Sequence, residues 1–218
     1  MSKTHIYFMP GLAAGPEIFE NLELSTALYE FHYLTWKKPL ALEETIANYT
    51  MRMAEEIKHE KPVLVGVSFG GIIVQEMSKF IDVQKIIIIS SVKSTSELPK
   101  RLKIASKSKI YKLFPTSIVT NFEDYAKYFV GKSLEKKAKI YKKYLSVRGK
   151  KYIKWSIHNV INWRQKEPME GIVHIHGTED NIFPFKNIKN CIKIDEGNHS
   201  MILLKPKQIS KIIHENLT

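Results

Sequence analysis

The chain has 218 residues, enough for one α/β domain with a sizeable core. Its hydrophobic fraction of 44% and charged fraction of 26% exclude extended disorder, and no apolar run is long enough to span a bilayer. The net charge of +12 is concentrated in residues 93–170, which hold 20 Lys or Arg and only 6 Asp or Glu. Because 30 of the 34 basic residues are Lys, we expect a solvated surface, with nucleic-acid or anionic-membrane binding as the weaker alternative.

The amino terminus and the single cysteine predict the cellular compartment of the protein. The amino terminus has no signal-peptide pattern, so a cytoplasmic protein is expected. Cys191 excludes an internal disulfide and fits a reducing compartment. It lies in a strand-like run, where a buried structural thiol is expected rather than a nucleophile. No Cys/His group has the spacing of a metal site, and we expect neither a metal nor a cofactor.

Short apolar runs alternate with amphipathic stretches over most of the chain. The first half predicts strands at 4–9, 31–36, 62–67 and 85–89, with helices at about 16–28, 42–58 and 69–80. The same rhythm returns near the end, with strands at 171–176 and 191–195 and a final helix over 199–217. This alternation predicts an α/β fold with a mostly parallel sheet covered by helices on both faces.

The rhythm is interrupted by residues 93–166, which hold no convincing strand. Helices are predicted at about 98–114, at 115–130, from Ser133 to about 145, and at 152–163. These residues are interpreted as an inserted helical cap, and residues 1–92 and 167–218 as the core domain. Three aromatic residues could line a pocket under this cap, although core packing is the expected role of each: Tyr128, Trp155 and Trp163.

The stretch Gly66-Val67-Ser68-Phe69-Gly70 lies between the third strand and an apolar helix. A strand, a sharp turn and a helix would lift the Ser68 hydroxyl out at the carboxyl end of the sheet. The elbow glycines Gly66 and Gly70 are expected because Cβ atoms there would crowd the turn. This glycine-flanked serine is a weak signal by itself, and its interpretation depends on an acid and a base further along the chain.

Two later loops supply an acid and a base. Asp180 follows the predicted strand at 171–176, and His199 follows the one at 191–195. Carboxyl ends of parallel strands share one edge of a sheet, so both side chains are expected beside Ser68. Taken singly, Asp180 could cap a turn and His199 could begin a helix. The other histidines are expected to be structural (His174 and His176) or receive no role (His5, His32, His59, His158 and His214).

The order Ser68, Asp180, His199 resembles the α/β-hydrolase superfamily. The resemblance also rests on His-Gly-x-x-Asp-x-x-x-Pro at 176–184 and Gly-x-His at 197–199. It covers the whole chain except the cap, which stands at the usual insertion point after the fourth strand. The chain departs from many members in carrying Pro10-Gly11 where they have His-Gly, and it lacks the amino-terminal strands of larger members.

The resemblance implies a Ser68-His199-Asp180 triad with Ser68 as nucleophile. His199 would take its proton, and Asp180 would orient His199. It also implies an oxyanion hole made by the backbone N–H groups of Leu12 and Phe69.

These roles predict a serine hydrolase that cleaves a small carboxylic ester without a cofactor, and its partner would be a small-molecule acyl substrate. The alternatives are a ligand-binding or signalling protein on the same fold, or a thioesterase, lactonase, amidase or carbon–carbon hydrolase with the same triad. Docking of the basic cap on an acidic polymer or lipid is a further alternative.

Overall fold

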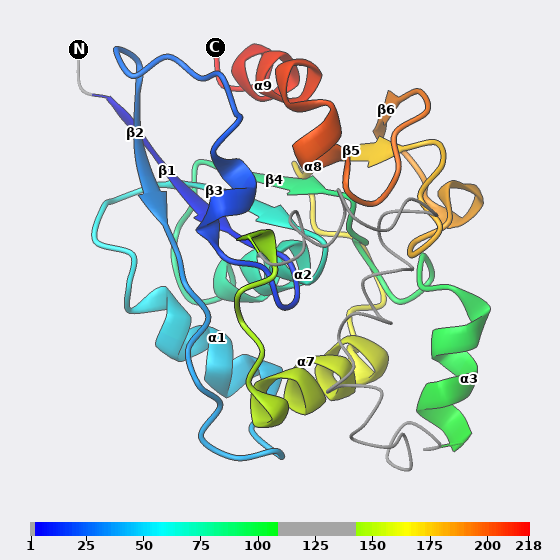
Figure 1. The fold of residues 1–218 in the computed structure, drawn as a ribbon. Coiled ribbons are helices and arrows are strands. Elements are labelled where there is room, and N and C mark those ends of the chain that lie inside the picture. Colours follow the sequence, from blue (N-terminus) through cyan, green and yellow to red (C-terminus); the bar gives the residue numbers. More distant parts are fainter. Residues whose placement is uncertain (1–2, 109–142) are drawn as a thin grey trace.

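Six strands form the central sheet of the computed structural model, which describes residues 3–108 and 143–218 (Figure 1). They are β1 (Thr4–Met9), β2 (Tyr29–Tyr33), β3 (Val63–Val67), β4 (Lys85–Ile89), β5 (Val173–Gly177) and β6 (Ile192–Ile194). Their order is β2-β1-β3-β4-β5-β6, and each neighbouring pair is parallel. The predicted parallel sheet is therefore confirmed.

Both faces of the sheet are buried because adjacent strand residues point to opposite sides. Val63, Val65 and Val67 of β3 belong to one apolar cluster, whereas Leu64 between them belongs to the other. Strands covered on both faces are continuously apolar, as the Ile run of β4 shows.

Helices cover the two faces in separate groups (Figure 1). One face carries α1 (Ile46–Ala54), α2 (Phe69–Met77) and α7 (Lys150–Asn162). The other carries the short 3-10 helix η1 (Pro16–Phe19) with α8 (Met201–Leu204) and α9 (Pro206–Glu215). A parallel sheet thus has the helical cover on both faces that the sequence predicts.

The helix predicted over 16–28 is wrong beyond Phe19. Only η1 forms, and the chain after it runs without helix to β2. Leu22 and Leu24 pack against the apolar cluster on that side, and the Glu23 N–H between them donates to Ser210 Oγ of α9 at 2.8 Å. The Glu23 N–H, which would donate within a helix, therefore donates to α9 instead.

Other boundaries shift for local reasons. The predicted helix over 42–58 is shorter, because the Thr45 side chain accepts a hydrogen bond from Asn48 N–H and caps α1. The predicted helix over 199–217 is divided into α8 and α9 at Pro206, which begins α9 because it has no N–H to donate. The second strand lies earlier than predicted, since Tyr29 already pairs with Thr4.

The inserted segment leaves the sheet after β4 and returns at β5, which is the adjacent strand. Its described part contains α3 (Lys100–Ser108), α7 and no strand. The predicted helix at 152–163 corresponds to α7, whereas the helix at 115–130 and most of the one from Ser133 lie outside the described residues. Trp155 and Trp163 are buried core residues, and Trp155 Nε1 donates to Glu44 O at 2.7 Å.

Two further expectations concern the cysteine and the membrane. Cys191 is half-buried just before β6, and burial raises the pKa of its thiol, which disfavours the reactive thiolate. None of the helices in the described ranges is both long and apolar enough to cross a bilayer.

Two methionines of α1 offer a matched test of the core. Met53 is fully buried, whereas Met51 is 49% exposed. We expect Met53→Ala to lower the free energy of unfolding by about 2–5 kcal/mol, because a buried side chain leaves a cavity. Met51→Ala should change it by less than about 0.5 kcal/mol. Urea unfolding of both variants checks this, and equal losses would contradict the assigned packing.

Candidate active site

Ser68 occupies a strained turn between β3 and α2. Its φ of 54° and ψ of −119° lie in a region that residues with a Cβ rarely adopt. The turn is held from the neighbouring strand β4 and the loop after it. Ser68 N–H donates to Ile89 O at 2.9 Å, and Ser91 Oγ donates to Ser68 O at 2.7 Å. These bonds fix the backbone so that the side chain is presented at the end of the sheet.

The two elbow glycines are required by close backbone approach. A Cβ on Gly66 would lie 2.6 Å from Gly70 C and 2.7 Å from Gly71 Cα, closer than atoms can approach. A Cβ on Gly70 would overlap the carbonyl oxygens of Met9 and Pro10. Side chains at these positions would therefore crowd the turn between β3 and α2.

The structure brings the three predicted residues together at the carboxyl edge of the sheet. His199 Nε2 lies 2.9 Å from Ser68 Oγ, and His199 Nδ1 lies 2.8 Å from Asp180 Oδ2. Both distances are those of hydrogen bonds. The three side chains come from loops that follow β3, β5 and β6, so the parallel topology accounts for their meeting.

Asp180 is held as a buried carboxylate. Its Oδ1 accepts from Ile182 N–H at 2.8 Å and from Phe183 N–H at 2.9 Å, while Oδ2 faces His199. Burial alone would raise the pKa of this carboxyl, but the facing imidazole of His199 and these hydrogen bonds outweigh it and leave the pKa below its usual value. An ionised Asp180 is suited to orient His199 and to stabilise its protonated form.

The loops that carry Asp180 and His199 are packed directly on each other. A Cβ on Gly177 would overlap the backbone of Gly197, and one on Gly197 would lie 2.9 Å from Gly177 Cα. Glu179 N–H also donates to Gly197 O at 2.9 Å. This contact explains why glycine occupies both positions, which the motifs at 176–184 and 197–199 contain.

A pair of buried histidines lies behind the carboxylate. His176 Nε2 is 2.9 Å from Phe183 O, and its Nδ1 is 3.2 Å from His174 Nε2. His176 also approaches Asp180 Oδ2 at 3.6 Å. Both rings are almost fully buried, in agreement with the structural role expected for them.

The loop at Pro10–Leu12 lies beside the serine. A Cβ on Gly11 would come within 3.4 Å of Ser68 Cβ, so the loop and the hydroxyl are neighbours. Trp36 Nε1 and Ala14 N–H both donate to Gly11 O at 3.0 Å, which fixes the loop. Leu12 and Phe69, whose N–H groups are the expected oxyanion donors, directly follow Gly11 and Ser68 in the chain.

Aromatic side chains that the sequence did not indicate surround this region. Trp36 stacks on Phe69 with ring centroids 5.3 Å apart, and Tyr152 of α7 lies 5.1 Å from Trp36. Phe183 meets the His199 ring edge-on at 5.6 Å. Their sequence positions carry no motif, so only the folded chain shows that they border the candidate site.

Comparison with solved structures identifies the architecture. An α/β-hydrolase fold protein from Burkholderia ambifaria is 12% identical, with a TM-score of 0.69, covering 98% of this chain and 91% of its own. The chain has the α/β-hydrolase fold. An esterase from Exiguobacterium antarcticum is 16% identical, with a TM-score of 0.65, covering 100% of this chain and 93% of its own. A bromoperoxidase from Bacillus anthracis is 14% identical, with a TM-score of 0.69 and coverages of 99% and 92%.

At these identities the likeness establishes the fold and leaves the activity to be argued from the site. No protein-family model matches the chain, and no curated protein matches it in sequence. The resemblance stated from the motifs is therefore confirmed at the level of the α/β-hydrolase fold. The catalytic roles of individual residues stay predictions.

The close approach at the Ser68 turn is testable with one methyl group. We expect Gly66→Ala to destabilise the fold by about 1–3 kcal/mol, because the added Cβ meets backbone that cannot move aside. Gly149→Ala is the matched control, since the nearest atom to its Cβ is 3.8 Å away, and it should stay within about 1 kcal/mol. Urea unfolding of both variants would contradict this reading if Gly66→Ala were as stable as the control.

The buried histidines predict a dependence of stability on pH. Burial and the neighbouring His176 hold the pKa of His174 well below its ordinary value, so the folded state keeps this ring neutral. The unfolded chain takes up a proton there as the pH falls below about 6.5, and stability is lost in that direction. His174→Gln should reduce the slope of unfolding free energy between about pH 7 and about pH 5 by up to about 1.4 kcal/mol per pH unit. An unchanged slope would contradict this.

Proposed function

We propose that this chain is a serine hydrolase that cleaves a small carboxylic ester through a covalent acyl-enzyme. The observation that carries the proposal is the hydrogen-bonded series from Ser68 Oγ through His199 to Asp180, at 2.9 and 2.8 Å. A serine hydroxyl is a weak nucleophile until a base takes its proton, and this series supplies that base. Solved structures with the same fold include proteins described as esterases, which agrees with the proposed reaction.

The first half of the reaction follows from these contacts. The Ser68 hydroxyl donates its hydrogen bond to His199 Nε2 and loses its proton to it while Oγ attacks the carbonyl carbon of the ester. The carboxylate of Asp180 stabilises the imidazolium that forms. His199 then gives the proton to the leaving alkoxide as the carbon–oxygen bond breaks, which releases the alcohol and leaves the acyl group on Ser68.

The second half repeats the chemistry with water. His199 takes a proton from a water molecule, whose oxygen attacks the acyl carbon of the intermediate. The bond to Ser68 Oγ then breaks as His199 returns the proton to it, and the carboxylic acid is released. No group other than the three side chains and water is needed to balance this cycle.

The negative charge on the tetrahedral intermediate needs hydrogen-bond donors. We assign this role to the backbone N–H groups of Leu12 and Phe69, because the Gly11 loop and the first turn of α2 flank Ser68. Phe69 is the first residue of α2, where free N–H groups and the helix dipole favour an anion. Each such donor is typically worth about a hundred- to a thousand-fold in rate.

The acyl group of the substrate would lie against an apolar wall. Trp36 stacks on Phe69 and contacts Tyr152, and Phe183 meets the His199 ring. Tyr152 and Phe183 are almost fully buried, so the partly exposed Trp36 would offer most of this wall to the substrate. We assign residues 93–166 as the helical cap, because this segment is inserted between the adjacent strands β4 and β5, and its described helix α7 contributes Tyr152 to the wall. An apolar wall favours a small hydrophobic acyl group over a charged one.

The proposal predicts the effect of removing one hydroxyl. Ser68→Ala should lower kcat for a short-chain nitrophenyl ester by at least about 10³-fold, because the nucleophile is lost, while the unfolding midpoint is retained. Ser78→Ala, at the opposite end of α2, is the matched control and should keep full activity. Turnover by Ser68→Ala equal to that of the unchanged chain would disprove the role of Ser68.

Two further measurements with the same variant separate the remaining alternatives. A fluorophosphonate probe should label the unchanged chain and not Ser68→Ala. A panel of esters, thioesters, lactones and amides then decides which bond is cleaved, since the series at Ser68 serves all of them. Slow single turnover with a large ligand-induced rise in Tm would instead favour a ligand-binding or signalling protein.

A further inference from the structure

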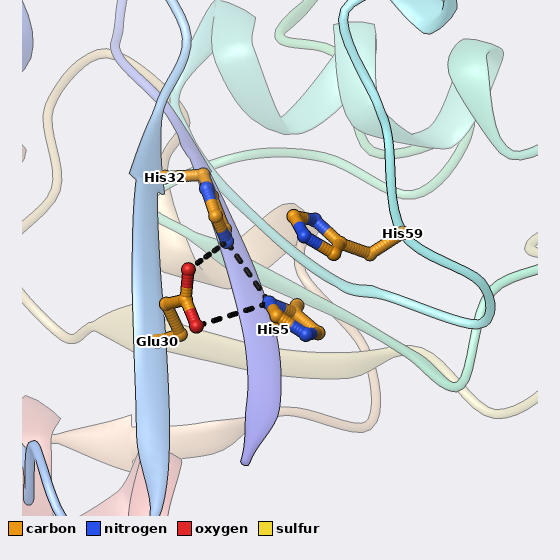
Figure 2. A group of neighbouring side chains, drawn as sticks. All are labelled: His5, Glu30, His32 and His59. Atoms are coloured by element: carbon orange, nitrogen blue, oxygen red, sulfur yellow. Dashed lines mark hydrogen bonds and ion pairs between the residues drawn. The ribbon is translucent and has the colours of Figure 1, made fainter. Parts of the chain in front are cut away.

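Four side chains of the kinds that ligate metals gather beside β1 and β2 (Figure 2). They are His5 of β1, Glu30 and His32 of β2, and His59 of the loop before β3. The sequence assigned them no role, because 54 positions separate the first from the last and no metal-site spacing links them. Their donor atoms nevertheless lie within 4.8 Å of one another.

Strand register places three of the four on one face. His5 pairs with Glu30, and Tyr7 pairs with His32, two residues further along both parallel strands. Residues two apart on a strand point to the same side, so His5, Glu30 and His32 share that side with Tyr7. The shared face of these three residues therefore follows from backbone pairing.

The fourth member is held over this face by Tyr7. Tyr7 Oη lies 2.7 Å from His59 Nδ1 and accepts from Lys58 N–H at 3.0 Å. The His59 ring stacks on that of His5, with centroids 3.6 Å apart and planes 8° from parallel. Figure 2 shows the His59 side chain reaching from its loop toward the two strands.

The spacing of the donor atoms matches a small cation. His5 Nδ1 is 3.1 Å from His32 Nε2, and each of these nitrogens is 3.8 Å from an oxygen of Glu30. The ligand atoms of a tetrahedral zinc site stand about 3.3 Å apart, because zinc–nitrogen bonds are about 2.0–2.1 Å long. Shifts of a few tenths of an ångström in partly exposed side chains would bring these three atoms to that spacing.

We propose that His5, Glu30, His32 and His59 form a binding site for a divalent ion of borderline softness, Zn²⁺ above all. Three imidazoles and one carboxylate are the donor set that such ions prefer, whereas Mg²⁺ and Ca²⁺ prefer oxygen. Binding requires the hydrogen bond between His5 and His32 to be replaced by the ion, and one of the stacked rings to turn toward it. Tyr7 then accepts from His59 Nδ1–H and leaves Nε2 of that ring for the ion.

The site is structural in this proposal. Four protein ligands fill a tetrahedral shell, so no position is left for a substrate. His5 precedes the level of Val63 at the start of β3, whereas Ser68 follows the end of that strand, so the ion would lie at the opposite edge from the triad. It would tie the edge strand β2 to β1 and to the loop that leads into β3, and hence stabilise the amino-terminal part of the sheet.

Zinc titration of the full chain, freed of metal by a chelator, tests the site. We expect one Zn²⁺ per chain by calorimetry and a rise in Tm with zinc concentration. His5→Gln and His32→Gln should each weaken binding by about tenfold or more, since each removes a ligand. His158→Gln on α7 removes a histidine elsewhere and should bind as the unchanged chain does.

Three further measurements keep the outcome unambiguous. Glu30→Gln is a second variant whose side chain is 52% exposed, so it should fold even if His5→Gln does not, and it should also bind more weakly. His199→Ala should retain zinc binding, because the triad histidine is outside the site. Co²⁺ should give the visible absorption of a tetrahedral complex in the unchanged chain and lose it in His32→Gln. Three results would overturn the proposal. They are absence of zinc binding, affinities of His5→Gln and His32→Gln equal to that of the unchanged chain, and loss of binding in His199→Ala.

Discussion

The turn at Ser68 depends on a close contact between backbones. Gly66 at the end of β3 touches Gly70 and Gly71 of α2, and Gly70 in turn touches the loop after β1. Without side chains in between, α2 can start immediately after a serine whose φ is 54°. Hydrogen bonds from the Ser91 hydroxyl and to Ile89 O hold that backbone from the strand β4 side. His199 and the loop at Gly11 both lie directly beside this turn.

The parallel sheet then brings distant segments to the same edge. Its strands all end at the side where Ser68 lies, so the loops after β5 and β6 reach the hydroxyl without any long excursion. The contact between Gly177 and Gly197 sets how close those loops come, and the two backbone N–H groups on Asp180 hold its carboxylate in place. The strained turn and the buried carboxylate are both stabilised by the surrounding backbone, which is the usual requirement for a preorganised site.

The two ends of the sheet carry different chemistry for the same topological reason. At the carboxyl end, loops deliver a hydroxyl, an imidazole and a carboxylate. At the amino end, the pairing of β1 with β2 delivers two imidazoles and a carboxylate to one face, and Tyr7 holds a third imidazole above them. Strand register decides where the loops at one end begin and which side chains share a face at the other, so the sheet sets the positions of both groups. The candidate chemistry at one end and the proposed ion at the other therefore share a scaffold without sharing a ligand.

The sequence by itself determined the sheet and the identity of the three triad candidates. Apolar runs such as 85–89 and the glycine pattern around Ser68 are local signals, because they reflect burial and backbone crowding at their own positions. Whether a segment forms a helix also depends on packing with distant residues, which is not a local signal. Residues 20–28 lack a helix, and there Leu22 and Leu24 contact the apolar cluster on the face that carries α9, while Glu23 N–H donates to Ser210 of α9. Only the tertiary structure placed Trp36 between Phe69 and Tyr152, and only strand pairing placed His32 beside His5. Such neighbours are set by register and helix packing between segments far apart in the chain, which no pattern within one segment encodes.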